Sequence, residues 1–104
     1  LSKLSNLKVL DLDRNPRFEN LEGLGSLSSL RTLTFNHTPV KDLSPLKGLR
    51  LTKLSASYTH VDNIDALKNM RSLRSLSVYR SLTSQEEAEE LVKKFKAEAI
   101  PIRR

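Results

Sequence analysis

The chain has 104 residues with no cysteine and no tryptophan, and 18 Lys and Arg against 12 Asp and Glu give a formal net charge of +6. Without cysteine, a disulfide framework, a thiol nucleophile and a thiolate metal site are all excluded. The length allows one domain, and no apolar run approaches the about 20 residues that a membrane-spanning helix needs.

A leucine-rich phrase recurs four times along the chain. It occurs as LSNLKVLDLDRN at 4–15, as LSSLRTLTFNHT at 27–38, around Leu54, and as MRSLRSLSVYRS at 70–81. The anchor leucines are separated by 23, 21 and 22 residues and are Leu10, Leu33, Leu54 and Leu76. Because one such unit cannot bury its apolar side alone, the fixed period predicts a solenoid of stacked units.

The chain begins inside a repeat. Leu1, Leu4 and Leu7 align with the leucines at 24, 27 and 30, and no polar capping unit precedes them. We therefore expect the C-terminal piece of a longer array, whose uncapped apolar end frays or self-associates. A processed mature terminus is the alternative.

Each repeat predicts one short strand followed by a tight return. The strands are expected at 9–13, 32–36, 53–57 and 75–79, with alternate residues turned inward. The inward residues are Leu10, Leu12, Leu33, Phe35, Leu54, Ala56, Leu76 and Val78. The position that follows, which we call the ladder position, holds Asn15, Thr38, Thr59 and Ser81. Its side chains are expected to satisfy backbone groups of neighbouring turns.

The return segments place apolar residues about every third position, which favours 3₁₀ turns. One repeat is irregular: it lacks a residue between Leu49 and Leu51, and Ala56 replaces a larger core residue. We expect a local kink or thin packing there.

The pattern changes after Ser81. Ser84 and Glu87 form an S-x-x-E capping box, and five apolar residues then share one helical face. They are Ala88, Leu91, Val92, Phe95 and Ala99. This segment is predicted to cap the last repeat, with a partner-binding helix as the alternative. The tail at 99–102 could add an edge strand.

These repeats resemble the short leucine-rich-repeat class of about 22 residues per turn, found in bacterial internalin-like proteins and a regulatory subunit of protein phosphatase-1. The segment at 38–70 is similar to bacterial arrays with Thr at the ladder position followed by D-L-S-P-L. The resemblance covers residues 1–82 and implies an α/β solenoid with a concave parallel sheet, a 3₁₀ and loop convex side, and protein binding. Residues 83–104 form the cap and tail of the same domain. Extracellular eukaryotic arrays of this type usually carry cysteine-stapled caps, so the lack of cysteine weakly favours the cytoplasm.

Catalysis and metal binding find no support in the sequence. His37 and His60 lie outside any ligand-spaced cluster, and no nucleophile stands beside a base. Asp11 and Asp13 could bind a cation or act as acid and base, but on an open sheet face such pairs are more often recognition groups or simply solvated. We therefore expect no enzyme activity, no cofactor and no metal.

The open face of the sheet supplies the candidate interface. Matching positions form columns, of which one is Asp13, Asn36, Ser57 and Tyr79, and the next is Arg14, His37, Tyr58 and Arg80. Tyr and Arg often anchor protein interfaces, and Tyr58 and Tyr79 are expected to form an aromatic step. The predicted partner-binding residues are Asp11, Asp13, Arg14, Asn36, His37, Tyr58, Tyr79 and Arg80.

The leading hypothesis is a non-enzymatic module that binds another protein on the concave face. A passive architectural segment of a larger protein is the first alternative. Nucleic-acid binding through the basic surface is less supported, because the Lys and Arg residues are scattered along the sequence and a backbone-tracking groove needs them in one stripe.

Overall fold

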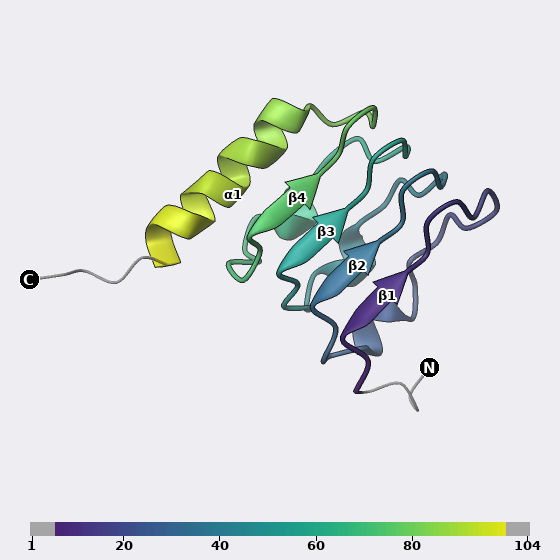
Figure 1. Ribbon diagram of the computed structural model, residues 1–104, viewed down its shortest axis with the longest axis horizontal. Coiled ribbons are helices and arrows are strands. Elements are labelled where there is room, and N and C mark those ends of the chain that lie inside the picture. Colours follow the sequence, from purple (N-terminus) through teal and green to yellow (C-terminus); the bar gives the residue numbers. More distant parts are fainter. Residues whose placement is uncertain (1–5, 100–104) are drawn as a thin grey trace, which may run out of the picture.

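The computed structural model describes residues 6–99, with side chains described up to residue 95. Four strands alternate with three 3₁₀ turns, and a C-terminal helix follows (Figure 1). The elements are β1 (Val9–Asp11), η2 (Leu24–Ser26), β2 (Thr32–Thr34), η3 (Ser44–Leu46), β3 (Lys53–Ser55), η4 (Asp65–Leu67), β4 (Ser75–Ser77) and α1 (Gln85–Ala99).

The strands form one parallel sheet in chain order, with the 3₁₀ turns on its far side (Figure 1). Leu10, Leu33, Leu54 and Leu76 are direct partners in the register, as their spacing predicts. Each strand has three residues rather than the predicted five, because the backbone turns soon after the third. The predicted leucine-rich-repeat solenoid, with its sheet, 3₁₀ returns and C-terminal helix, is confirmed.

The core is a narrow stack of aliphatic side chains between the sheet and the returns. Leu33, Phe35, Leu54 and Ala56 are fully buried, and the corresponding Leu76 and Val78 are buried as well, as predicted. In the first described repeat, Leu10 and Leu12 are only partly buried against this core. Each repeat therefore depends on its neighbours for burial.

The ladder position bonds within its own turn, and the expectation of bonds to neighbouring turns is wrong. The Thr38 hydroxyl donates to the Phe35 carbonyl (2.6 Å) and the Thr59 hydroxyl to the Ala56 carbonyl (2.7 Å). Ser81 does the same with Val78, and the Asn15 amide bonds the Leu12 carbonyl. The turn brings the carbonyl three residues upstream within reach of a short side chain.

The shortened repeat causes no break in the sheet. The register runs unbroken from Leu33 through Leu54 to Leu76, and both Leu49 and Leu51 are buried while Arg50 between them is exposed. The missing residue is absorbed before β3 begins. The expected kink is therefore absent from the sheet.

Helix α1 covers β4 and closes its free edge. The Ser84 hydroxyl accepts a bond from the Glu87 N–H (3.1 Å), and Ala88, Val92 and Phe95 are buried. Gln85 bonds this edge at β4 and just beyond it: its Nε2 donates to the Leu76 carbonyl (3.1 Å), and its Oε1 accepts from the Val78 N–H (2.7 Å). One amide thus takes the place of the next strand. The Ala99 side chain, the predicted edge strand at the tail, and Leu1 and Leu4 lie outside the described residues.

We predict that Leu33→Ala lowers the free energy of unfolding by about 2–5 kcal/mol, because it leaves a cavity in the centre of the stacked core. Urea denaturation followed by circular dichroism measures the change. Val9→Ala is the matched control, since Val9 precedes Leu10, the register partner of Leu33, and is 61% exposed. A loss below about 1 kcal/mol for Leu33→Ala would contradict the prediction that Leu33 stabilises the core.

Candidate protein-interaction surface

The column just past the strands joins the repeats through side chains. The Asn36 N–H donates to Asp13 Oδ1 (2.7 Å), the Ser57 N–H donates to Asn36 Oδ1 (2.7 Å), and the Tyr79 N–H donates to Ser57 Oγ (3.2 Å). Asn36 Oδ1 also accepts the Ser55 hydroxyl (2.8 Å). Here each acceptor side chain satisfies the backbone of the next repeat. Asp13 and Asn36, predicted as partner-binding residues, therefore have a structural role.

The next column adopts a left-handed backbone in all four repeats. Arg14, His37, Tyr58 and Arg80 have φ angles of 62°, 58°, 58° and 57°. Their backbones continue the sheet bonding: the Arg14 N–H reaches the Asn36 carbonyl (2.8 Å), and the Tyr58 N–H reaches the Tyr79 carbonyl (2.7 Å). The turn ends the strict alternation of side chains. Tyr58 consequently faces outward, with 52% of its surface exposed.

The aromatic contact on this face joins His37 and Tyr58. Their rings are stacked, with centroids 4.4 Å apart and planes 8° from parallel. The expected Tyr58–Tyr79 step is not among the ring contacts of the described residues, because the Tyr58 ring stacks on His37 instead. Tyr79 is 55% exposed and lines a different hollow, between β4 and α1, with Arg74, Gln85 and Lys93. Because the repeats share this backbone turn, equivalent positions of adjacent repeats lie side by side, and the Tyr58 ring therefore contacts the His37 ring.

A shallow hollow of about 270 Å³ lies beside this ring pair. Five predicted partner-binding residues line it, namely Asp13, Arg14, Asn36, His37 and Tyr58, together with Ser55, Ser57 and Ser77. The other three predicted residues, Asp11, Tyr79 and Arg80, are not part of its lining. Asp11 instead accepts bonds from the Thr34 hydroxyl (3.1 Å) and the Asp13 N–H (2.9 Å).

Ser55 and Ser77 were missed by the sequence reasoning, although both are direct register partners on the open face. Their side chains are small, so they line the hollow between larger neighbouring side chains. The signal that finds them is alignment: they occupy the same strand position as Asp11 and Thr34. Ser55 and Ser77 thus belong to the same open-face column as Asp11, one of the predicted partner-binding residues.

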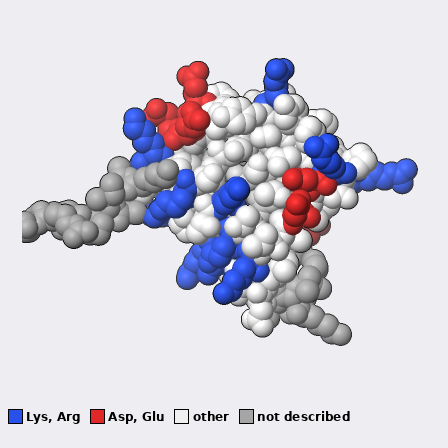
Figure 2. Space-filling view, in the orientation of Figure 1, with Lys and Arg blue, Asp and Glu red and all other residues white. Residues whose placement is uncertain are grey.

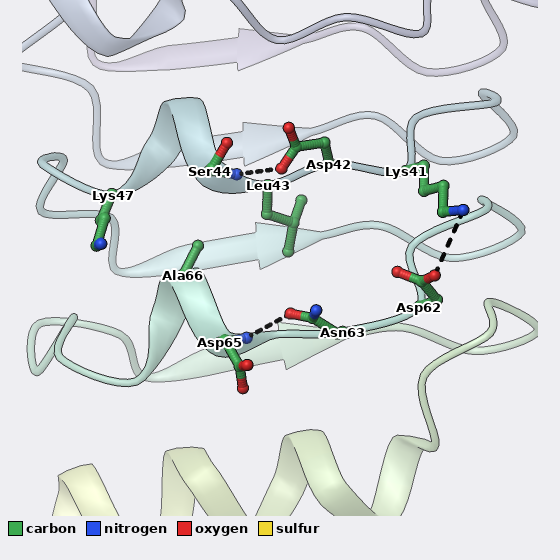
Figure 3. A pocket seen from close by; sticks show the side chains of 9 residues that line it. All are labelled: Lys41, Asp42, Leu43, Ser44, Lys47, Asp62, Asn63, Asp65 and Ala66. Carbon is green, nitrogen blue, oxygen red and sulfur yellow. Dashed lines mark hydrogen bonds and ion pairs between the residues drawn. The ribbon is translucent and has the colours of Figure 1, made fainter.

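The return side holds a larger hollow of about 420 Å³, shown in Figure 3. Its polar groups already bond one another: Asp42 Oδ1 accepts the Ser44 N–H (2.9 Å), and Asn63 Oδ1 accepts the Asp65 N–H (2.9 Å). The bond from Ser44 lowers the pKa of Asp42 below its ordinary value of 3.8. These side chains begin 3₁₀ turns, which is a structural task.

Metal chemistry is not supported by the part of the chain that the structure describes. Within it, no group of three or more His, Asp or Glu side chains could hold a metal ion, and neither His37 nor His60 belongs to such a group. No helix among these residues is long and apolar enough to cross a membrane. The open-face hollow is the candidate site because five of the predicted partner-binding residues line it and the stacked His37 and Tyr58 rings stand beside it.

We predict that Asn36→Ala lowers the free energy of unfolding by about 1–3 kcal/mol, because the Ser57 N–H and the Ser55 hydroxyl both lose their acceptor. Asn36→Asp keeps that acceptor and should lose far less, since Asp13 does the same task one repeat earlier. Chemical denaturation of both variants checks this. Equal losses for alanine and aspartate would contradict the proposed role of the Oδ1 atom.

Comparison with known proteins yields structural matches. No family model and no curated protein matches the chain. An internalin (inlF) from Listeria monocytogenes is 29% identical, with a TM-score of 0.72, over 82% of this chain and 26% of its own. Internalin C2 (inlC2) from the same organism is 34% identical, with a TM-score of 0.76, over 82% of this chain and 38% of its own. With four in-register strands and 3₁₀ returns, the chain belongs to the leucine-rich-repeat proteins, in their short, internalin-like class.

Proposed function

We propose that this chain binds another protein on the concave face of its sheet, with the His37–Tyr58 pair as the anchor. The likeness to internalins supports a protein-interaction module in general terms. In this proposal residues 1–82 present the surface and residues 83–104 cap it within the same domain. The module needs no cofactor and no catalytic group.

The single observation that carries the proposal is the stacked ring pair, held half-exposed beside a hollow. Two rings stacked 4.4 Å apart hold each other in place, so they form a rigid aromatic anchor at low cost in side-chain entropy. Arg14, Asp13 and the serine hydroxyls surround it with donors and acceptors. An apolar or aromatic partner side chain can lie against the rings while its backbone bonds the polar floor.

The backbone conformation supports a role for these side chains beyond folding. A left-handed φ costs an L-residue with a Cβ roughly 1–2 kcal/mol, and glycine avoids that cost. All four repeats nevertheless carry a long or aromatic side chain there: Arg14, His37, Tyr58 and Arg80. Strained positions that retain large, exposed side chains are typical of binding surfaces.

The test uses a displayed peptide library selected on the immobilised chain. Selected peptides should bind the variant His37→Asn, Tyr58→Asn at least about tenfold more weakly, because a lost aromatic anchor costs about 1–2 kcal/mol. Asparagine tolerates the left-handed backbone, so the variant should remain folded, which denaturation confirms.

Lys47→Ala is the control, since Lys47 is exposed on the return side and lines the hollow there. It should leave binding unchanged. Peptides that bind the double asparagine variant as tightly as the wild type, or that lose affinity only with Lys47→Ala, would place the site elsewhere and contradict the proposal.

A further inference from the structure

The amino ends of the strands carry a row of basic residues that the sequence spacing conceals. Lys8, Arg31 and Arg74 hold the same position, directly before β1, β2 and β4, and Thr52 holds it before β3. Backbone hydrogen bonds join these positions in order. The Arg31 N–H donates to the Lys8 carbonyl (2.9 Å), the Thr52 N–H to the Arg31 carbonyl (2.7 Å), and the Arg74 N–H to the Thr52 carbonyl (2.8 Å). Residues about 22 apart in sequence are thus adjacent in space.

Further cations widen this row into an edge. Lys53 begins β3 and pairs with Thr32 and Ser75 on its two sides. Arg50 is exposed just before it, and Lys93 of α1 lines a hollow of about 360 Å³ with Arg74. Figure 2 shows Lys and Arg gathered where the strands begin, at the lower left of the view. We call Lys8, Arg31, Arg50, Lys53, Arg74 and Lys93 the basic edge.

The acidic residues lie mostly elsewhere. No Asp or Glu occurs in residues 23–41, 43–61 or 66–85, which contribute four of the six members of the basic edge. The ion pairs Lys41–Asp62 (3.6 Å) and Lys68–Asp65 (3.1 Å) lie on the return side. Glu89 lines the hollow beside Lys93, and the Gln85 amide bonds it (3.4 Å). The excess positive charge is thus concentrated on one edge.

The two arginines of the row are oriented by the backbone. Arg31 Nη1 donates to the Ser28 carbonyl (3.1 Å) and the Leu30 carbonyl (2.9 Å), and Arg74 Nη1 donates to the Leu73 carbonyl (3.0 Å). These bonds leave the Nε and Nη2 hydrogens of each guanidinium for a ligand. A fixed guanidinium loses less entropy when it binds a carboxylate, which it can engage with two parallel bonds.

We propose that the basic edge binds an acidic segment of the protein partner, rich in Asp and Glu and extended across the four strands. Four strands at about 4.8 Å spacing span about 15 Å, which about five residues of extended peptide cover. Ser75 adds a hydroxyl donor beside Lys53, its register partner. Single-stranded nucleic acid is less favoured, because it relies on a series of exposed rings for stacking. Of the two exposed tyrosines, only Tyr79 shares a hollow with members of the basic edge, Arg74 and Lys93. The inference rests on the proposed function and adds a second contact surface to it.

The experiment titrates a fluorescein-labelled oligo-glutamate peptide with the chain and follows fluorescence anisotropy at ionic strengths of about 0.01 M and about 0.1 M. The variant Arg50→Glu, Lys53→Glu should bind about tenfold more weakly than the wild type, because it reverses two exposed charges of the edge. The matched control is Arg17→Glu, Lys47→Glu, which changes the net charge equally at exposed residues of the return segments and should lose less than about twofold.

Equal losses in the two double variants would show a net-charge effect and overturn the proposal. Tighter binding of an oligo-thymidine of equal charge, with the same variant dependence, would also overturn it and assign the edge to nucleic acid. Self-association that light scattering detects and Arg50→Glu, Lys53→Glu abolishes would assign it to a second copy. The His37→Asn, Tyr58→Asn variant should bind oligo-glutamate normally, so the edge and the ring pair can fail independently.

Discussion

The structure depends on the in-register stacking of one leucine per repeat. Leu33, Leu54 and Leu76 are partners in neighbouring strands and are buried by one another's repeats. This stacking fixes where every other residue of a repeat falls, because a one-residue slip would turn the leucines to the open face. The columns on that face, including the ring pair and the basic edge, are consequences of this register.

The open face carries structural residues and the proposed recognition residues in adjacent columns. Asp13, Asn36 and Ser57 use their side chains to hold the next repeat's backbone, whereas His37 and Tyr58, one residue later, face solvent. The division follows from the left-handed turn, which directs the second residue away from the sheet. Substitutions in the first column should therefore change stability, and those in the second should change binding. The two effects can be separated experimentally.

The sequence predicts the architecture because the period of the leucines is a global signal. It places the register, the 3₁₀ returns and the capping helix correctly. It fails where the backbone leaves ideal alternation: positive φ angles decide that Tyr58 meets His37 rather than Tyr79. The basic edge is concealed because a one-dimensional reading separates Arg31, Lys53 and Arg74, which the register brings to one edge. The expected ladder bonds to neighbouring turns do not form, because the turn places the carbonyl three residues upstream next to each ladder side chain, including the Asn15 amide.

The amide of Gln85 also limits how a partner can approach. Many recognition domains bind a peptide by adding it as an extra strand to an open sheet edge. At β4 that route is closed, because the Val78 N–H and the Leu76 carbonyl, which would pair with such a strand, are already bonded by Gln85. The same bonds prevent another chain from joining the sheet there, a common path to aggregation. Strand addition at β4 is therefore not a route by which a ligand can join this repeat.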